Sequence, residues 1–350
     1  MPKSDHRMSG ASKHTSRSRP SPLVTGFKFL LALAPLAWIF LRMDIGQFSA
    51  ALKGVSWWAV GLIAVIVLVS LTLQGVRWWL LLRAFLPDLP FSSTISAHFK
   101  GVFYSIILPT SAAQDVVRAA ILSKKRDYGV IWGATWVGRL LGLLALSTLS
   151  LTGLALIDKT ELPTWAVRAI ATSLIVIAVL LLLSFSKILT RHIRLLLTPR
   201  VPEPVMRVVE GIRQAVYLFR GKLGAVVAVG LITLAVQMLV VAMPMILILA
   251  ITGQLYPVQC LFFVPAIEIA VISVPLTPNG LGIREGLHAL FLTRIGLSEE
   301  QIGVYVMVAL LGIVLRVVGG IPVVYDLWRG KKPTVGTREN TAQPRVPEES

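Results

Sequence analysis

The sequence predicts an all-α polytopic membrane protein, an inverted-repeat bundle of about six full spans plus two re-entrant helical hairpins, about eight apolar segments in all. Composition is the first reason: the 350 residues are 55% hydrophobic and only 15% charged, with a mean hydropathy of +0.76. A soluble domain of this length exposes far more charge. The second reason is that several apolar runs reach the roughly 20 residues that cross about 30 Å of hydrocarbon. The third is a broken apolar pair that occurs once in each half of the chain.

The N-terminal part predicts a tail and two spans. Residues 1–22 are polar and basic, as in a disordered cytoplasmic tail. The apolar run 23–41 is the first span, because it is too long for a typical signal peptide and no small-residue cleavage site follows it. Residues 57–76 form the second span. Arg77 and Trp78 at its end are typical of a snorkelling arginine beside an interfacial aromatic belt.

The rest of the first half combines a broken pair with a third span. Residues 91–123 are moderately apolar and are interrupted at Pro109, which favours two short helices over one long helix. The pair is either a re-entrant hairpin or two short crossings, and both interpretations leave the chain on the same side. The third span, 130–157, contains Arg139.

The second half repeats this order, beginning with two further spans. These are residues 165–185 and 223–251. The basic segment 187–222 separates them, and its apolar and charged residues alternate at helical spacing. That pattern predicts an amphipathic helix on the cytoplasmic membrane surface.

A second broken pair and a final span complete the membrane domain. The pair covers residues 258–295. Ser298 is suited to cap the next helix, with Gln301 completing a capping box, and this last span runs to about residue 325. Residues 326–350 are polar and predict a disordered cytoplasmic tail.

Lys and Arg are unevenly distributed among the connecting segments, and this distribution predicts the orientation. Segments 118–128 and 187–222 are rich in Lys and Arg, whereas 158–164 is nearly balanced and 252–257 carries no charge. The positive-inside rule then places both termini and the two basic segments on the cytoplasmic side of the inner membrane. The formal net charge of +17 is explained by this topology and by an anionic lipid surface, so no nucleic-acid partner is predicted.

The two halves, 23–157 and 165–325, carry matching features that predict an inverted-topology repeat, an architecture common among secondary transporters. In each broken pair a proline and small residues precede charged residues at a helix start, Pro109 with Asp115 and Arg118, and Pro278 with Arg284 and Glu285. Each pair is followed by a span with an arginine and a glycine, Arg139-x-x-Gly142 and Arg316-x-x-Gly319.

The candidate substrate-binding residues lie in these motifs, since a charged side chain inside an apolar span is costly unless it is paired, hydrated or bound to a ligand. They are Asp115, Arg118, Arg139, Glu268, Gly280, Gly282, Arg284, Glu285 and Arg316. Arg139 is either half of a structural ion pair, with Glu268 or Asp115, or a contact for a headgroup phosphate. Glu268 is either the partner of an arginine or a proton-coupling carboxylate. We expect the four arginines to surround one cavity.

The remaining candidate groups point to an anion and away from a metal. Gly280 and Gly282 would let a headgroup approach the backbone, and acids near the helix starts are also suited to capping. The chain has one cysteine, Cys260, and five scattered histidines, so no disulfide, metal site or cofactor is predicted. The predicted outer loops offer no catalytic set of side chains, which disfavours an enzyme.

The chain resembles the lysylphosphatidylglycerol synthase transmembrane family, also called flippase-like, over almost the whole membrane domain. The segments that carry the resemblance are Leu73–Arg83, Leu108–Ala119, Val137–Leu146 and Pro275–Gly286. The chain departs from the family pattern at Ala113-Gln114, where relatives usually have a glycine pair. It departs again at Gly142, where relatives often have an acid.

The resemblance implies a flippase that moves an anionic or lipid-linked headgroup across the bilayer, carried on a membrane phospholipid or a polyprenyl-linked lipid. In the best-known members a cytosolic transferase domain makes the lipid, and no such domain is predicted in this sequence. A separate cytosolic or membrane transferase is therefore an implied partner. The alternatives are a membrane-embedded lipid-modifying transferase and an accessory protein of a glycolipid or cell-envelope glycosyltransferase pathway.

Overall fold

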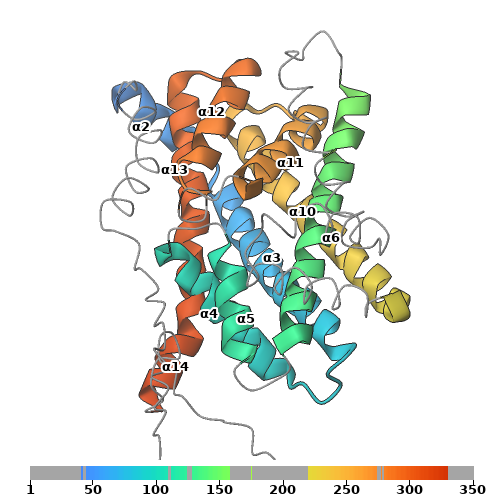
Figure 1. Ribbon diagram of the computed structural model, residues 1–350. Helices are drawn as coiled ribbons and strands as arrows, with labels where there is room; N and C mark the ends of the chain where they lie inside the picture. The colour runs from blue at the N-terminus through green and yellow to red at the C-terminus, as the bar shows by residue number, and fades with distance from the viewer. Residues whose placement is uncertain are drawn as a thin grey trace, which may run out of the picture.

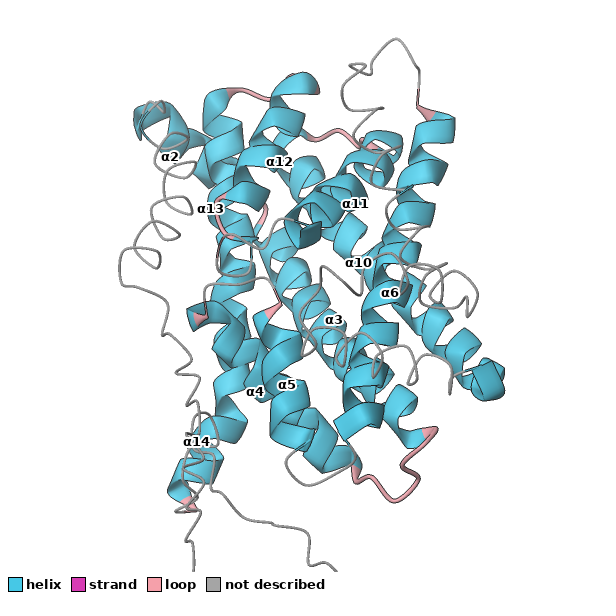
Figure 2. Ribbon diagram, in the orientation of Figure 1, coloured by secondary structure: helices cyan, strands magenta, loops and turns pink. Residues whose placement is uncertain are grey.

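The computed structural model describes residues 45–108, 112–123, 128–157, 220–273 and 280–329, with the single residues Leu41, Ile175 and Thr277. All regular structure in these ranges is helical (Figures 1 and 2). The helices are α2 (Ile45–Gly54), α3 (Trp57–Arg83), α4 (Phe91–Ile107), α5 (Ala113–Ser123), α6 (Tyr128–Leu156), α10 (Leu223–Thr252), α11 (Pro257–Ser273), α12 (Ile283–Arg294), α13 (Glu299–Leu315) and α14 (Ile321–Trp328). Short 3₁₀ segments are η2 (Arg220–Lys222) and η4 (Arg316–Gly320). Apart from Leu41 and Ile175, the predicted spans 23–41 and 165–185 lie outside the described residues, as do the N-terminal tail, residues 330–350 and nearly all of 187–222. The predicted C-terminal tail starts too early, because residues 326–328 still belong to helix α14.

Four long apolar segments among the described residues are able to cross a membrane. They are Trp57–Arg83, Tyr128–Leu156, Gly224–Thr252 and Glu299–Trp328. The first extends beyond the predicted end at residue 76, because the backbone stays helical through Arg77 and the leucines after it. The last is continuous in space but changes from α13 to the 3₁₀ segment η4 and back to α14. Ser298 and Gln301 form the predicted capping box at its start.

Each broken pair consists of one medium and one short helix. Helix α4 has 17 residues and α5 has 11, while α11 has 17 and α12 has 12. At 1.5 Å per residue the shorter members are about 17 Å long, too short to cross about 30 Å of hydrocarbon. In Figure 1, α4 and α5 lie together in the lower half of the bundle, and α11 and α12 lie together in the upper half.

The first helix of each pair packs tightly on a long helix of the other half. Gly153 on α6 lies against α11, where an added Cβ would be 2.5 Å from the Phe262 amide nitrogen. Gly319 in η4 lies against α4, where an added Cβ would overlap the Phe99 carbonyl oxygen and come 2.9 Å from the Phe103 amide nitrogen. Only glycine lets two helix backbones approach this closely.

The long helices hold these pairs around two apolar cores. Helix α3 packs against α10. Each of these two helices also contacts both α6 and α13. The larger core joins side chains of α3, α10, α11, α12 and α13, and the smaller one joins α3 through α6. Large apolar side chains remain exposed on the outside, as expected for surfaces that face lipid. They include Trp57, Val65, Val227 and Leu231.

Candidate functional site: a charged cavity between the long helices

A cavity of about 180 Å³ lies between α3, α10, α11, α12, α13 and η4. Aliphatic side chains form most of its wall, and Pro244 on α10 is among them. The polar and aromatic side chains that reach it are Ser70, Gln74, Glu268, Arg284, Glu285, His288, Tyr305 and Arg316. Four of the predicted site residues therefore line one space, although they come from three separate elements.

Arg284 and Glu268 form a bidentate ion pair at the cavity. The Arg284 Nε donates to Glu268 Oε1 at 2.7 Å, and Nη2 donates to Glu268 Oε2 at 3.1 Å. Two parallel charge-assisted bonds fix the relative position of α11 and α12. Of the two interpretations of Glu268, the structure shows the arginine partner.

Glu285 and the glycines before it shape the start of α12. The Gly282 amide donates to Glu285 Oε2 at 2.6 Å, so this carboxylate caps the helix. Gly280 and Gly282 have φ of 77° and 82°, in the left-handed region that favours glycine. An added Cβ at Gly280 would overlap the Val271 side chain on α11. The space beside Gly280 is therefore filled by protein, and its predicted headgroup contact stays a prediction.

Arg316 is the unpaired cation of this cavity. It is the first residue of η4 and is partly buried. No ion pair or hydrogen bond joins its side chain to another described residue. Arg284 and Glu268 neutralise each other, and Glu285 is occupied by the α12 cap. The cavity thus carries a guanidinium that is ready for an anion.

His288 adds an unused polar atom to the same cavity. Its Nδ1 donates to the Arg284 carbonyl oxygen at 2.9 Å, since a carbonyl only accepts. The ring stacks on Tyr305, with centroids 5.6 Å apart. The other ring nitrogen, Nε2, is buried and has no hydrogen-bond partner. In the neutral ring this nitrogen is an acceptor, so a ligand hydroxyl or ammonium would satisfy it.

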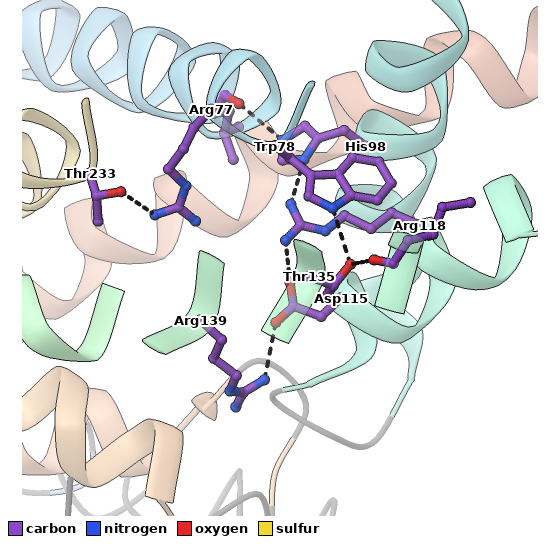
Figure 3. Close-up of polar contacts among 10 residues, drawn as sticks. Arg77, Trp78, His98, Asp115, Arg118, Thr135, Arg139 and Thr233 are labelled. Atoms are coloured by element: carbon purple, nitrogen blue, oxygen red, sulfur yellow. Dashed lines mark hydrogen bonds and ion pairs between the residues drawn. The ribbon is translucent and has the colours of Figure 1, made fainter. Parts of the chain in front are cut away.

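The remaining predicted charges form a second group, shown in Figure 3. Asp115 accepts from Arg118 at 2.7 Å and from Arg139 at 3.1 Å, so Asp115 is the partner of Arg139 and Glu268 is not. Neither arginine lines the cavity. The prediction that all four arginines surround one cavity is therefore wrong, because a single carboxylate in the first turn of α5 holds two of them.

Arg118 is locked in place on several sides. It lies 3.2 Å from His98 Nδ1, and the opposite His98 nitrogen donates to the Leu71 carbonyl oxygen at 3.0 Å. Its guanidinium also lies over the ring of Trp78, 4.7 Å from the centroid. These contacts join α5 to α3 and α4, which indicates a positioning role for Arg118.

Two residues that sequence reasoning assigned to the membrane interface are buried. Trp78 is 1% exposed and donates to Thr135 Oγ1 at 3.1 Å, and Arg77 is 8% exposed and donates to Thr233 Oγ1 at 3.3 Å. The expected interface belt at this position is therefore wrong. The apolar residues 80–82 after them were the available signal, because they show that the span continues beyond the arginine.

Comparison with known proteins agrees with this architecture. The family model described as "Lysylphosphatidylglycerol synthase TM region" matches residues 27–320, which include both charged groups, the first three long apolar segments and most of the fourth. No curated protein and no solved structure matches the chain. The chain is therefore a multi-pass membrane protein that belongs to the lysylphosphatidylglycerol synthase transmembrane region family.

Proposed function

We propose that this protein translocates a lipid with an anionic headgroup across the bilayer, with the headgroup phosphate bound in the cavity beside Arg316 and Arg284. The observation that carries the proposal is the guanidinium of Arg316, which has no ion-pair or hydrogen-bond partner among the described residues, in a cavity where Glu268 is paired with Arg284 and Glu285 accepts the Gly282 amide. In this proposal the chain is a carrier and not an enzyme. A separate transferase supplies any modified lipid, which is a phospholipid or a polyprenyl-linked lipid.

Energetics support an anion at this position. An arginine at membrane depth costs several kcal/mol unless a counter-charge or water reaches it. A phosphate supplies the counter-charge and accepts paired N–H bonds from the planar guanidinium. The apolar part of the wall suits the lipid portion next to the headgroup. The free acceptor on His288 favours headgroups that also carry a hydroxyl or ammonium donor.

We infer that the chain is an inverted repeat with re-entrant hairpins α4–α5 and α11–α12. Reciprocal packing supports this proposal: α11 lies on α6 through Gly153, and α4 lies on η4 through Gly319. Likewise α3 contacts α13 as α10 contacts α6, and the two central helices α3 and α10 contact each other. An inverted repeat gives two related conformations of similar energy, which is the basis of alternating access.

The proposed orientation has both termini in the cytoplasm of a cell whose inner membrane holds the protein. In a Cys260→Ser background, single cysteines at position 125 or 200 are expected to resist an impermeant thiol reagent added outside intact cells. Single cysteines at position 160 or 255 are expected to react. The physical reason is the excess of Lys and Arg in 118–128 and 187–222. Strong outside labelling at position 200 would contradict the orientation.

Arg316→Gln is the sharpest test of the carrier function. Transport of a fluorescent phosphatidylglycerol in reconstituted vesicles is expected to fall at least about tenfold, which corresponds to the loss of one charge-assisted contact of about 1.4 kcal/mol or more. Stability to denaturing detergent is expected to stay the same or rise, because an unpaired partly buried charge is removed.

Arg83→Gln is the matched control, because Arg83 ends α3 and contacts the ring of Trp79 away from the cavity. This variant is expected to transport at the wild-type rate. Arg316→Lys separates charge from shape: it keeps the cation but loses the paired donors, so an intermediate rate is expected. Wild-type transport by a well-folded Arg316→Gln protein would refute the proposed role of the cavity.

A further inference from the structure

Beyond the end of the cavity lies a second arginine without an acidic partner. Gln74 on α3 and Val240 on α10 line the cavity, and Arg77 and Gln237 occupy the adjoining turns of the same two helices. Arg77 is 8% exposed, and its Nη1 donates to the Thr233 hydroxyl. Its Nε is buried and has no hydrogen-bond partner. Among the described residues this buried guanidinium therefore meets a neutral hydroxyl and no carboxylate.

Asp115, the carboxylate shown in this region, is already in use. Asp115 binds both Arg118 and Arg139, as Figure 3 shows, while Arg77 reaches away from it toward Thr233. The buried Nε of Arg118 also lacks a partner. Two guanidiniums thus share the Asp115 carboxylate, and Arg77 adds a third positive charge that contacts no described acid. This charge balance is unfavourable unless an anion joins the three arginines.

Arg77 and Gln237 lie side by side against Gly142 on α6. A Cβ placed on Gly142 would lie 4.0 Å from Arg77 Nη1 and 3.8 Å from Gln237 Nε2. These are the only atoms that it would meet within 4 Å among the described residues outside its own helix. Both are N–H donors, so the position offers hydrogen bonds to an acceptor.

We propose that Arg77 and Gln237, whose N–H groups lie together against Gly142, form a second phosphate site, separate from the Arg316 site in the cavity. This inference rests on the proposed function. The lipid phosphate would leave Arg316 and Arg284 and would next be held by Arg77 on α3 and Gln237 on α10. A substrate would then meet one unpaired arginine from each half of the chain. The ligand is a phosphate group, borne by a lipid or free.

Equilibrium binding tests the site directly. Purified full-length protein in a neutral detergent is titrated with radiolabelled orthophosphate and, separately, with short-chain phosphatidylglycerol. Wild type is expected to bind about two phosphate groups per chain, and Arg77→Gln about one, with at least about tenfold weaker binding at the lost site. Binding of the lipid alone identifies a headgroup site, and binding of orthophosphate as well identifies a general phosphate site.

Substitutions at Gly142 remove the need to alter Arg77. Gly142→Glu places a carboxylate beside the guanidinium and is expected to displace the second phosphate without loss of folded protein. The glutamine in Gly142→Gln has nearly the same size as glutamate but no charge. The Gly142→Gln protein is therefore expected to bind more phosphate than the Gly142→Glu protein. Thermal unfolding in the same detergent reports whether each variant is folded.

The outcomes separate this inference from the proposed function. Loss of one phosphate in Arg316→Gln, together with full binding in folded Arg77→Gln, would overturn the second site and leave the cavity proposal standing. Binding of only about one phosphate group per wild-type chain would also overturn the second site. Loss in Arg77→Gln with unchanged binding in Arg316→Gln would support the second site and count against the cavity as a phosphate site.

Discussion

Replacing Glu268 with glutamine is expected to lower the free energy of unfolding by about 2–3 kcal/mol, less than the roughly 3–5 kcal/mol for a fully buried ion pair, because the Glu268 and Arg284 side chains are 17% and 24% exposed. The change leaves the Arg284 guanidinium without its bidentate acceptor at the junction of α11 and α12. Arg284→Gln is expected to lower the free energy of unfolding by a similar amount, because it leaves the Glu268 carboxylate without its arginine partner. Unfolding in mixed detergent micelles measures both changes.

The double variant Glu268→Gln, Arg284→Gln is the informative control. Two neutral amides can hydrogen-bond to each other, so the double variant is expected to recover about 2 kcal/mol relative to the sum of the single changes. Additive losses would show that the two residues do not stabilise the protein as a pair. Transport is expected to remain low in the recovered protein, since the cavity has then lost one of its two arginines.

Replacing Gly153 or Gly319 with alanine is expected to destabilise the protein by about 3 kcal/mol or more, because each Cβ would overlap backbone atoms that cannot move aside easily. Gly153 faces the backbone of α11, and Gly319 faces that of α4. Unfolding in mixed micelles and the yield of folded protein after extraction measure the effect.

Gly230→Ala is the matched control for these substitutions. Gly230 lies inside α10, and an added Cβ would meet nothing within 4 Å among the described residues. This change is expected to be neutral or to stabilise the helix by up to about 1 kcal/mol. Equal effects of Gly153→Ala and Gly230→Ala would contradict the close packing of α6 on α11.

The charge pairs were the most predictable part of the site. A buried arginine needs a partner, so the sequence limited the partners of Arg139 to Asp115 and Glu268, and the structure selects the first. For Glu268 the structure shows the role of an arginine partner, and the arginine is Arg284. Sequence spacing could not divide these residues into two groups, because that division depends on how α5 and α12 pack against other helices.

The buried polar residues of α3 and α4 were less predictable. An arginine beside tryptophans gives the same pattern at a membrane interface and in a protein core, so Arg77 and Trp78 were assigned to the wrong environment. His98 and His288 had no motif of their own, and only tertiary contacts with Arg118 and Arg284 show their roles. At Gly280, where the sequence predicts close approach of a headgroup to the backbone, the structure shows a packing requirement against Val271.

The contact of α4 with the last helices sets the order in which the membrane domain is completed during synthesis. Lys100 on α4 forms an ion pair with Asp326 on α14, 226 positions later in the chain. A ribosome that adds about 5–20 residues per second needs roughly 10–45 s to supply that partner. Throughout this interval Lys100 lacks the acid that it pairs with in the folded protein. Helix α14 therefore completes the contacts of the first hairpin, and a nascent chain that stops before it leaves Lys100 without this partner.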